Sequence, residues 1–143
     1  MSKLSEVLKE LLAENNLDYK TFAAEIGVSA SRITDYIRND KLPTVQTLIK
    51  IADYFNCSTD YLLGKEYENA HEEFCTPPSF AQRLIFLKEN FHLAHKEIYS
   101  GKGITKSRYF EWLSGKRQPS IDNVINLAEN LHCSIDFILG REN

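Results

Sequence analysis

The sequence predicts an all-α protein made of two tandem five-helix domains joined by a partly helical linker. Three observations lead to this prediction. Apolar residues recur with the 3.6-residue period of a helix, and no stretch alternates with the period of two that marks a strand. Turn and capping residues divide the periodic stretches into short helices. A shift of 76 residues superposes residues 4 to 64 on residues 80 to 140 without a gap, with 15 of the 61 positions identical.

The repeat fixes the expected domain boundaries. Its identical positions include three pairs of turn residues, Gly27 with Gly103, Pro43 with Pro119 and Gly64 with Gly140. Two unrelated helical stretches would rarely keep every turn residue in phase. We therefore expect domains at residues 1 to 64 and 80 to 143, with a linker over residues 65 to 79 between them.

In the first copy, an apolar stripe over residues 4 to 12 predicts an initial helix of about three turns. The third helix, over residues 30 to 38, turns Ile33 and Ile37 inward and most of its polar residues toward solvent. A polar side chain that can accept free N–H groups precedes each of the last four helices, in the order Asp18, Ser29, Thr44 and Ser58.

The linker carries a helical pattern of its own. Tyr67, Ala70 and Phe74 have the spacing of a two-turn helix that packs on a domain or on a partner chain. Ser79 with Gln82 then forms the capping-box pattern of a helix that begins at the next residue. The second copy therefore starts with its own capped helix.

Composition and charge limit the functions to consider. The chain has 17 Lys and Arg against 20 Asp and Glu, so its net charge of -3 provides no general attraction for nucleic acid. The second copy is the basic one, because residues 80 to 143 carry 9 positive and 7 negative side chains whereas residues 1 to 66 carry 8 and 10. No apolar run reaches the roughly 18 residues of a membrane span and the N-terminus lacks a signal peptide, so we expect a cytoplasmic protein.

No residue pattern predicts catalysis, a metal site or a cofactor. The three cysteines include no C-x-x-C pair, and the four histidines are not at zinc-ligand spacing. No Ser, Cys or Lys lies in a recognisable nucleophile motif, and no Gly-rich phosphate loop is present. We expect no enzyme activity, no cofactor, no membrane contact and no small-molecule ligand.

Residues 19 to 38 have the order of a helix-turn-helix: an apolar-faced helix, a Gly-containing turn and a capped polar helix. With its flanking helices, this stretch resembles the DNA-binding domain of the Cro and lambda cI repressor (XRE) family, and the resemblance covers almost the whole chain, twice. The residues that carry it in the first copy are 22 to 29, Ile33, Pro43, Leu48, Ala52, Leu62 and Leu63. In the second copy they are residues 103 to 105, 112 to 120, Ala128, Ile138 and Leu139.

The resemblance implies a lambda-repressor-like fold and a sequence-specific, repressor-like transcriptional regulator, which binds operator DNA in the nucleoid of a prokaryotic cell. It implies that the third helix of one or both domains reads the major groove of double-stranded DNA. In the first copy Ala30, Ser31, Thr34 and Asp35 take the base-facing positions, Tyr19, Lys20 and Ser29 flank phosphates, and Arg32, Arg38 and Lys41 supply positive charge. In the second copy Lys106, Ser107, Phe110 and Glu111 take the base-facing positions. Lys96, Thr105 and Arg108 lie beside the DNA backbone, and Lys116 and Arg117 supply positive charge.

The second copy departs from the family pattern in its second helix. The capping Asp18 becomes Ala94, and the small Ala23 becomes Tyr99. Gly101 would add about 1 kcal/mol to the free energy of forming this helix. We expect the helix to be short or displaced. The third helix of this copy is then either a DNA reader or part of a degenerate copy kept for packing or dimerisation.

The net acidity and the divergent helix also motivate a second hypothesis. The chain would be a protein-interaction module, of antitoxin or anti-repressor type, that keeps the fold without reading bases. A continuous positive surface around residues 28 to 41 and 104 to 117 would favour DNA, whereas an apolar patch there would favour a protein partner. A homodimer is a further candidate assembly.

Overall fold

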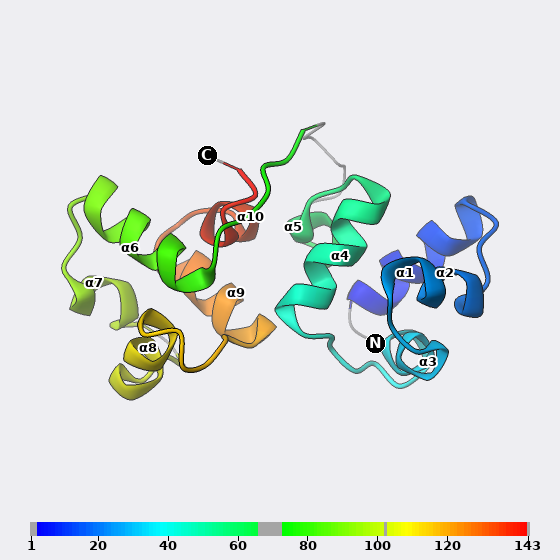
Figure 1. Cartoon of the computed structure of the whole chain (residues 1–143), viewed down its shortest axis with the longest axis horizontal. Helices are drawn as coiled ribbons and strands as arrows, with labels where there is room; N and C mark the ends of the chain where they lie inside the picture. Colours follow the sequence, from blue (N-terminus) through cyan, green and yellow to red (C-terminus); the bar gives the residue numbers. More distant parts are fainter. Residues whose placement is uncertain (1–2, 66–72, 102, 143) are drawn as a thin grey trace. The chain divides into compact units, whose positions relative to one another are not determined.

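The computed structural model describes residues 3 to 65, 73 to 101 and 103 to 142, and within them all regular structure is helical. The chain divides into two compact units, residues 1 to 73 and 74 to 143 (Figure 1). The predicted all-α fold of two tandem modules is confirmed, while a separate linker over residues 65 to 79 stays a prediction. None of the described helices is long and apolar enough to pass through a membrane.

In its described part, unit one holds five helices in the predicted order. They are α1 (Lys3–Glu14), α2 (Tyr19–Ile26), α3 (Ala30–Arg38), α4 (Val45–Phe55) and α5 (Thr59–Leu62). Helix α1 packs against α3 and α5, and α2 packs against α3 and α4. The core between them consists of fully buried apolar side chains, chiefly Leu4, Leu8, Phe22, Ile33, Leu48, Ile51 and Leu62.

Side-chain caps start the last four helices of unit one, as predicted. A backbone N–H three residues further on donates to each cap: Thr21 to Asp18 at 2.7 Å, Arg32 to Ser29 at 3.3 Å, Thr47 to Thr44 at 3.2 Å and Tyr61 to Ser58 at 2.8 Å. The bond from the Thr21 backbone also lowers the pKa of Asp18, because it favours the ionised carboxylate. The caps satisfy N–H groups that the helices themselves leave unbonded, and they fix where each helix begins.

Unit two repeats this architecture in its described residues. Its helices are α6 (Phe80–Asn90), α7 (His95–Tyr99), α8 (Lys106–Leu113), α9 (Ile121–Asn130) and α10 (Ile135–Leu139). The predicted capping box is present, since Ser79 and Gln82 each accept the other's backbone N–H at 3.2 Å. Phe74 lies in a non-helical segment, and the other two residues of the predicted linker helix, Tyr67 and Ala70, lie outside the described residues.

Helix α7 departs from its counterpart in unit one. It has 5 residues where α2 has 8, which confirms the expected short helix. Ala94 offers no side-chain acceptor, and Glu97 Oε1 instead accepts the Ala94 N–H at 2.9 Å. Gly101 lies beyond the end of α7. The prediction that it adds to the free energy of forming this helix is therefore wrong. A Cβ at Gly101 would overlap the Asn130 side chain, so the glycine lets the chain pass close to α9.

Two buried arginines secure the C-terminal part of unit two. Arg83 donates from Nε and Nη2 to the Phe137 carbonyl oxygen at 2.9 and 2.6 Å, which ties α6 to α10. Arg141 donates to Asp136 at 2.7 Å, and both side chains are almost completely buried. The Arg141 guanidinium lies over the ring of Phe74, 4.3 Å from its centroid. Phe74 therefore packs as part of unit two.

We predict that Gly140→Ala lowers the free energy of unfolding of unit two by about 2 kcal/mol or more. At Gly140 φ is +88°, and an added Cβ would lie 2.8 Å from Pro78 Cδ and 3.1 Å from Arg83 Cδ. Denaturant unfolding can be followed by the emission of Trp112, which is the single tryptophan of the chain and is buried in unit two.

Gly115→Ala is the matched control. Its φ is +80°, but no atom lies within 4 Å of the added Cβ, so only the backbone strain of about 1 kcal/mol is expected. Equal losses of stability in the two variants would contradict the close packing at Gly140.

Candidate nucleic-acid interface

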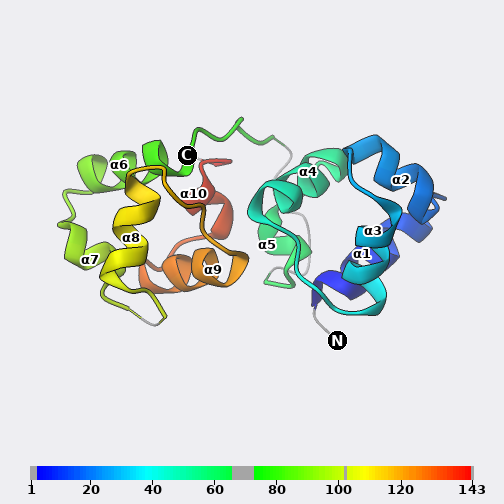
Figure 2. The same cartoon turned by 60° about the horizontal axis from the view of Figure 1, so that its bottom comes forward.

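Helix α3 presents two unlike faces. Ile33, Tyr36 and Ile37 are buried against the rest of unit one, whereas Ser31 and Arg32 are exposed. Figure 2 shows α3 beside α1 within this unit. Because buried residues recur every three to four positions along α3, the side chains between them point away from the core. The helix is thus held firmly on one side and open on the other.

The N-terminus of α3 is tightly organised. Gly27 adopts φ +75° and ends α2, and the Val28 N–H donates to the Ala23 carbonyl oxygen at 3.0 Å. The hydroxyl groups of Ser29 and Ser31 lie 3.1 Å apart, so the cap and an exposed first-turn side chain share a hydrogen bond. The first-turn N–H groups and the helix dipole make this end favourable for an anion such as a phosphate.

The second turn of α3 is less open than predicted. Thr34 and Asp35 are half-buried, whereas Ala30 is exposed. The Thr34 hydroxyl donates to the Ala30 carbonyl oxygen at 3.2 Å, and Asp35 accepts a hydrogen bond from Asn39 at 2.8 Å. Asn39 was missed in the sequence, although its i, i+4 spacing from Asp35 is one at which helical side chains meet.

The remaining predicted residues of unit one lie around α3. Arg38, at its C-terminal end, lies 5.8 Å from the ring centroid of Tyr19, so the structure brings these two predicted residues together. Tyr19 is half-buried by its surroundings, while Lys20 and Lys41 are exposed. The predicted cations of unit one therefore reach solvent, and the aromatic ring serves partly as packing.

Helix α8 repeats the two-faced arrangement in unit two. Tyr109 and Trp112 are buried, while Lys106, Ser107 and Arg108 are exposed in its first turn. The Thr105 hydroxyl accepts the Arg108 N–H at 3.1 Å and caps the helix as Ser29 caps α3. The predicted Lys96 and Lys116 are also exposed. The second copy therefore keeps an open third helix despite its shortened α7.

Aromatic contacts join α7 to α8. Tyr99 lies 5.1 Å from Tyr109 between ring centroids, in the place where the first copy has the small Ala23. His95 Nδ1 and the Tyr109 hydroxyl are 2.8 Å apart. The ring of Phe110 lies 5.4 Å from that of His95 and is 38% exposed. Large rings at these positions therefore hold the short α7 against the third helix.

Two predicted residues of unit two interact with each other. The Arg117 Nε atom lies 3.0 Å from Glu111 Oε2, and the two side chains form an ion pair that their spacing in the sequence does not predict. Arg117 is about half-exposed and Glu111 less so, so this pair is solvent-screened. Its effect is local: the Glu111 carboxylate is matched by a cation and contributes little net negative charge to the surface.

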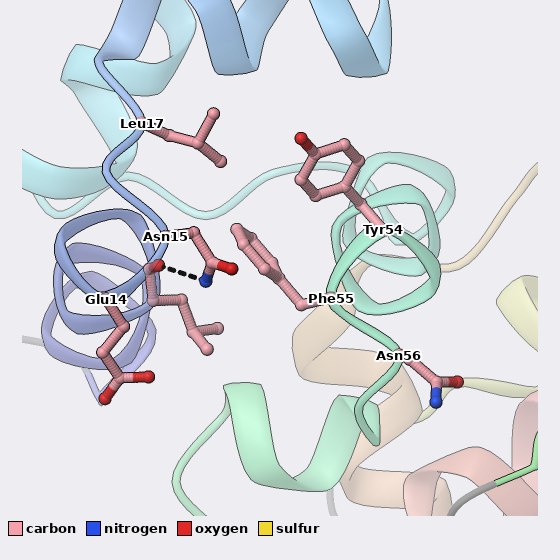
Figure 3. A pocket seen from close by; sticks show the side chains of 7 residues that line it. Glu14, Asn15, Leu17, Tyr54, Phe55 and Asn56 are labelled. Carbon is pink, nitrogen blue, oxygen red and sulfur yellow. Dashed lines mark hydrogen bonds between the residues drawn. The ribbon is translucent and has the colours of Figure 1, made fainter.

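Two clefts in the described residues have linings that include none of the predicted contact residues. A cleft of about 540 Å³ in unit one is lined by Leu11, Glu14, Asn15, Leu17, Tyr54, Phe55 and Asn56 (Figure 3). A cleft of about 530 Å³ in unit two uses Leu87, Leu93 and Leu131 at the equivalent positions. The cleft therefore lies at the same place in both copies of the module. No group of three or more possible metal ligands occurs among the described residues.

Comparison with known families gives two matched regions. A family model described as helix-turn-helix matches residues 8 to 62 and residues 92 to 138, which together are more than half of the chain. Each region contains one of the exposed third helices, α3 or α8. No solved structure matches the chain.

Curated relatives match a part of the chain. It is 33% identical over 63 residues to the HTH-type transcriptional regulator ImmR of Bacillus subtilis, a match that covers 44% of this chain and 50% of the relative. It is 28% identical over 72 residues to uncharacterized HTH-type transcriptional regulators of Rickettsia conorii and Rickettsia prowazekii, covering 48% of this chain and 66% and 78% of those relatives. The chain therefore spans about half the length of the Bacillus relative.

We predict that the stability of unit two falls above pH 10 through Tyr109. Burial raises the pKa of Tyr109 to about 12, whereas an exposed tyrosine titrates near 10. The folded state therefore favours the neutral phenol. This contribution to stability is intact below pH 10 and is lost as the pH rises from 10 toward 12.

Tyr109→Phe removes this ionisation. Between pH 10 and 12 the free energy of unfolding of the variant should fall less steeply than that of the parent chain, by about 1 kcal/mol per pH unit. Denaturant titrations followed by far-UV circular dichroism measure both slopes. Identical slopes would show that Tyr109 ionises as readily in the folded state as in the unfolded one.

Proposed function

This chain belongs to the helix-turn-helix family, whose module it carries twice, and we propose from this that it is a sequence-specific, repressor-like DNA-binding regulator. It would insert α3, and in the same manner α8, into the major groove of operator DNA. The groove is about 12 Å wide and admits one α-helix. The chain would act by binding DNA, without a catalytic step.

One observation carries the proposal: both third helices are capped, buried on one side and open on the other. In each unit a hydroxyl cap precedes an exposed Ser-Arg pair, Ser31 with Arg32 and Ser107 with Arg108. Side chains near the start of such a helix can reach base edges while its first N–H groups meet a phosphate. The same construction in two divergent copies supports a shared function.

The contact roles follow from chemistry and exposure. Ala30 and Ser31, with Lys106 and Ser107, are exposed and take the base-facing roles. The capped helix starts at Ser29 and Thr105 face phosphates. The other exposed cations provide the salt-dependent attraction to the DNA backbone, namely Lys20, Arg32, Arg38, Lys41, Lys96, Arg108 and Lys116. Arg117 adds less, because it is paired with Glu111.

The local charge favours DNA over a protein partner. Exposed cations outnumber exposed acids over residues 28 to 41 and 104 to 117, although the whole chain is acidic. Within these two fully described ranges, Phe110 is the one large apolar side chain that is exposed. An apolar patch, which the protein-interaction hypothesis requires, is therefore lacking there. We propose a cytoplasmic regulator that associates with the nucleoid when bound, as a monomer or a homodimer.

We predict that Arg32→Ala and Arg108→Ala each weaken DNA binding and reduce its salt dependence. Each phosphate contact that is lost should flatten the slope of log affinity against log salt by about 0.9. Fluorescence titrations of the full chain with labelled genomic fragments, at several salt concentrations, measure affinity and slope. Lys50→Ala is the control, because Lys50 is an exposed cation of α4 outside the predicted contact set.

The titrations have two outcomes that would contradict the proposal. One is the absence of any preferred fragment at physiological ionic strength. The other is an equal loss of affinity in Arg32→Ala and Lys50→Ala, which would indicate attraction by general charge alone. Circular dichroism of each variant establishes that a loss of binding does not reflect unfolding.

A further inference from the structure

The two third helices begin with the same kind of hydroxyl cap and the same exposed Ser-Arg pair. Ser31 and Arg32 of α3 have identical counterparts, Ser107 and Arg108, at the same positions of α8. The caps are chemically alike, because Ser29 and Thr105 both accept the arginine N–H, at 3.3 and 3.1 Å. A helix start with the same cap and the same neighbours would approach a DNA backbone in the same way.

The side chains next to this shared cap and Ser-Arg pair differ between α3 and α8. The exposed Ala30 at the start of α3 corresponds to the exposed Lys106 of α8. One turn later the half-buried Thr34 corresponds to Phe110, which is 38% exposed. The Thr34 hydroxyl is engaged with the helix backbone at 3.2 Å. One surface therefore presents two small side chains, and the other presents a long cation and a large ring.

The acidic residue that follows in each helix does not add to the difference between the surfaces of α3 and α8. Asp35 and Glu111 occupy the same place in the repeat, and each is bonded to a side chain of its own unit. Asn39 donates to Asp35 at 2.8 Å, and Arg117 pairs with Glu111 at 3.0 Å. The contrast between the two surfaces therefore rests on Ala30 against Lys106 and on Thr34 against Phe110.

We infer that the chain recognises two unlike half-sites, one for each unit, so that its DNA site is composed of two different sequence motifs. This inference rests on the proposed function. Lysine pairs with the O6 and N7 acceptors of guanine, whereas the alanine methyl contacts the thymine methyl group. The half-site of unit two contains a guanine opposite Lys106, and the half-site of unit one contains a thymine opposite Ala30.

The test is selection of binding sites by the full chain from duplexes of random sequence. The expected result is two enriched motifs that differ at the base pair facing residue 30 or residue 106. Lys106→Ala should remove the guanine preference from one motif only, lowering discrimination there roughly 5- to 150-fold. Ala30→Lys is the matched reciprocal change, and it should add guanine to the other motif.

A double variant tests the two half-sites more strictly. Lys106→Ala with Phe110→Thr gives α8 the residues of α3 at both positions, and the two selected motifs should converge. Because Phe110 contacts the rings of His95 and Tyr99, circular dichroism must show that the double variant folds. Should it unfold, the single variants Lys106→Ala and Ala30→Lys still decide the question.

The remaining outcomes separate this inference from the proposed function. A site made of one motif, either alone or repeated, would overturn the inference and leave the proposed function standing. Variants that alter both motifs together, or neither, would also overturn it. If the parent chain enriches no sequence at all, the proposed function itself fails, and this inference fails with it.

Discussion

The architecture depends on how each third helix is held at its start. A hydroxyl group accepts the N–H at the third helical position, in α3 from Ser29 and in α8 from Thr105. Buried side chains then fix the rotation of the helix about its own axis, chiefly Ile33 in unit one and Trp112 in unit two. With both the start and the rotation fixed, the first-turn side chains that remain outside have a defined direction. Recognition of a rigid partner such as DNA requires side chains whose direction is fixed in this way.

The second copy shows how far the module can diverge while this constraint is kept. Its α7 lacks an acceptor side chain at the N-cap and is three residues shorter than α2. Aromatic packing replaces the close approach of small residues, with Tyr99 against Tyr109 and the His95 ring bonded to the Tyr109 hydroxyl. At the other end, Arg83 ties α6 to α10. The supporting elements have changed, and the cap and burial of α8 have not.

The sequence predicts the features that depend on short-range rules. Caps lie three residues from the N–H they accept, and core positions follow the helical period, so Ser29 and Ile33 could be assigned from spacing. The Arg117–Glu111 pair spans a turn outside helical periodicity, and the Arg83–Phe137 bond joins residues 54 positions apart. Neither contact is indicated by a short-range pattern in the sequence. For the same reason the half-buried state of Asp35 depends on tertiary packing that spacing alone does not describe.

The capped first turns of α3 and α8 are the surfaces that we propose meet DNA. Amide chemical-shift mapping of the isotope-labelled chain during a titration with duplex DNA tests this most directly. The account predicts that the largest shifts occur at the Arg32 and Arg108 amides and their first-turn neighbours. Shifts concentrated instead along the clefts near Tyr54 and Leu93, with the first turns unchanged, would contradict it.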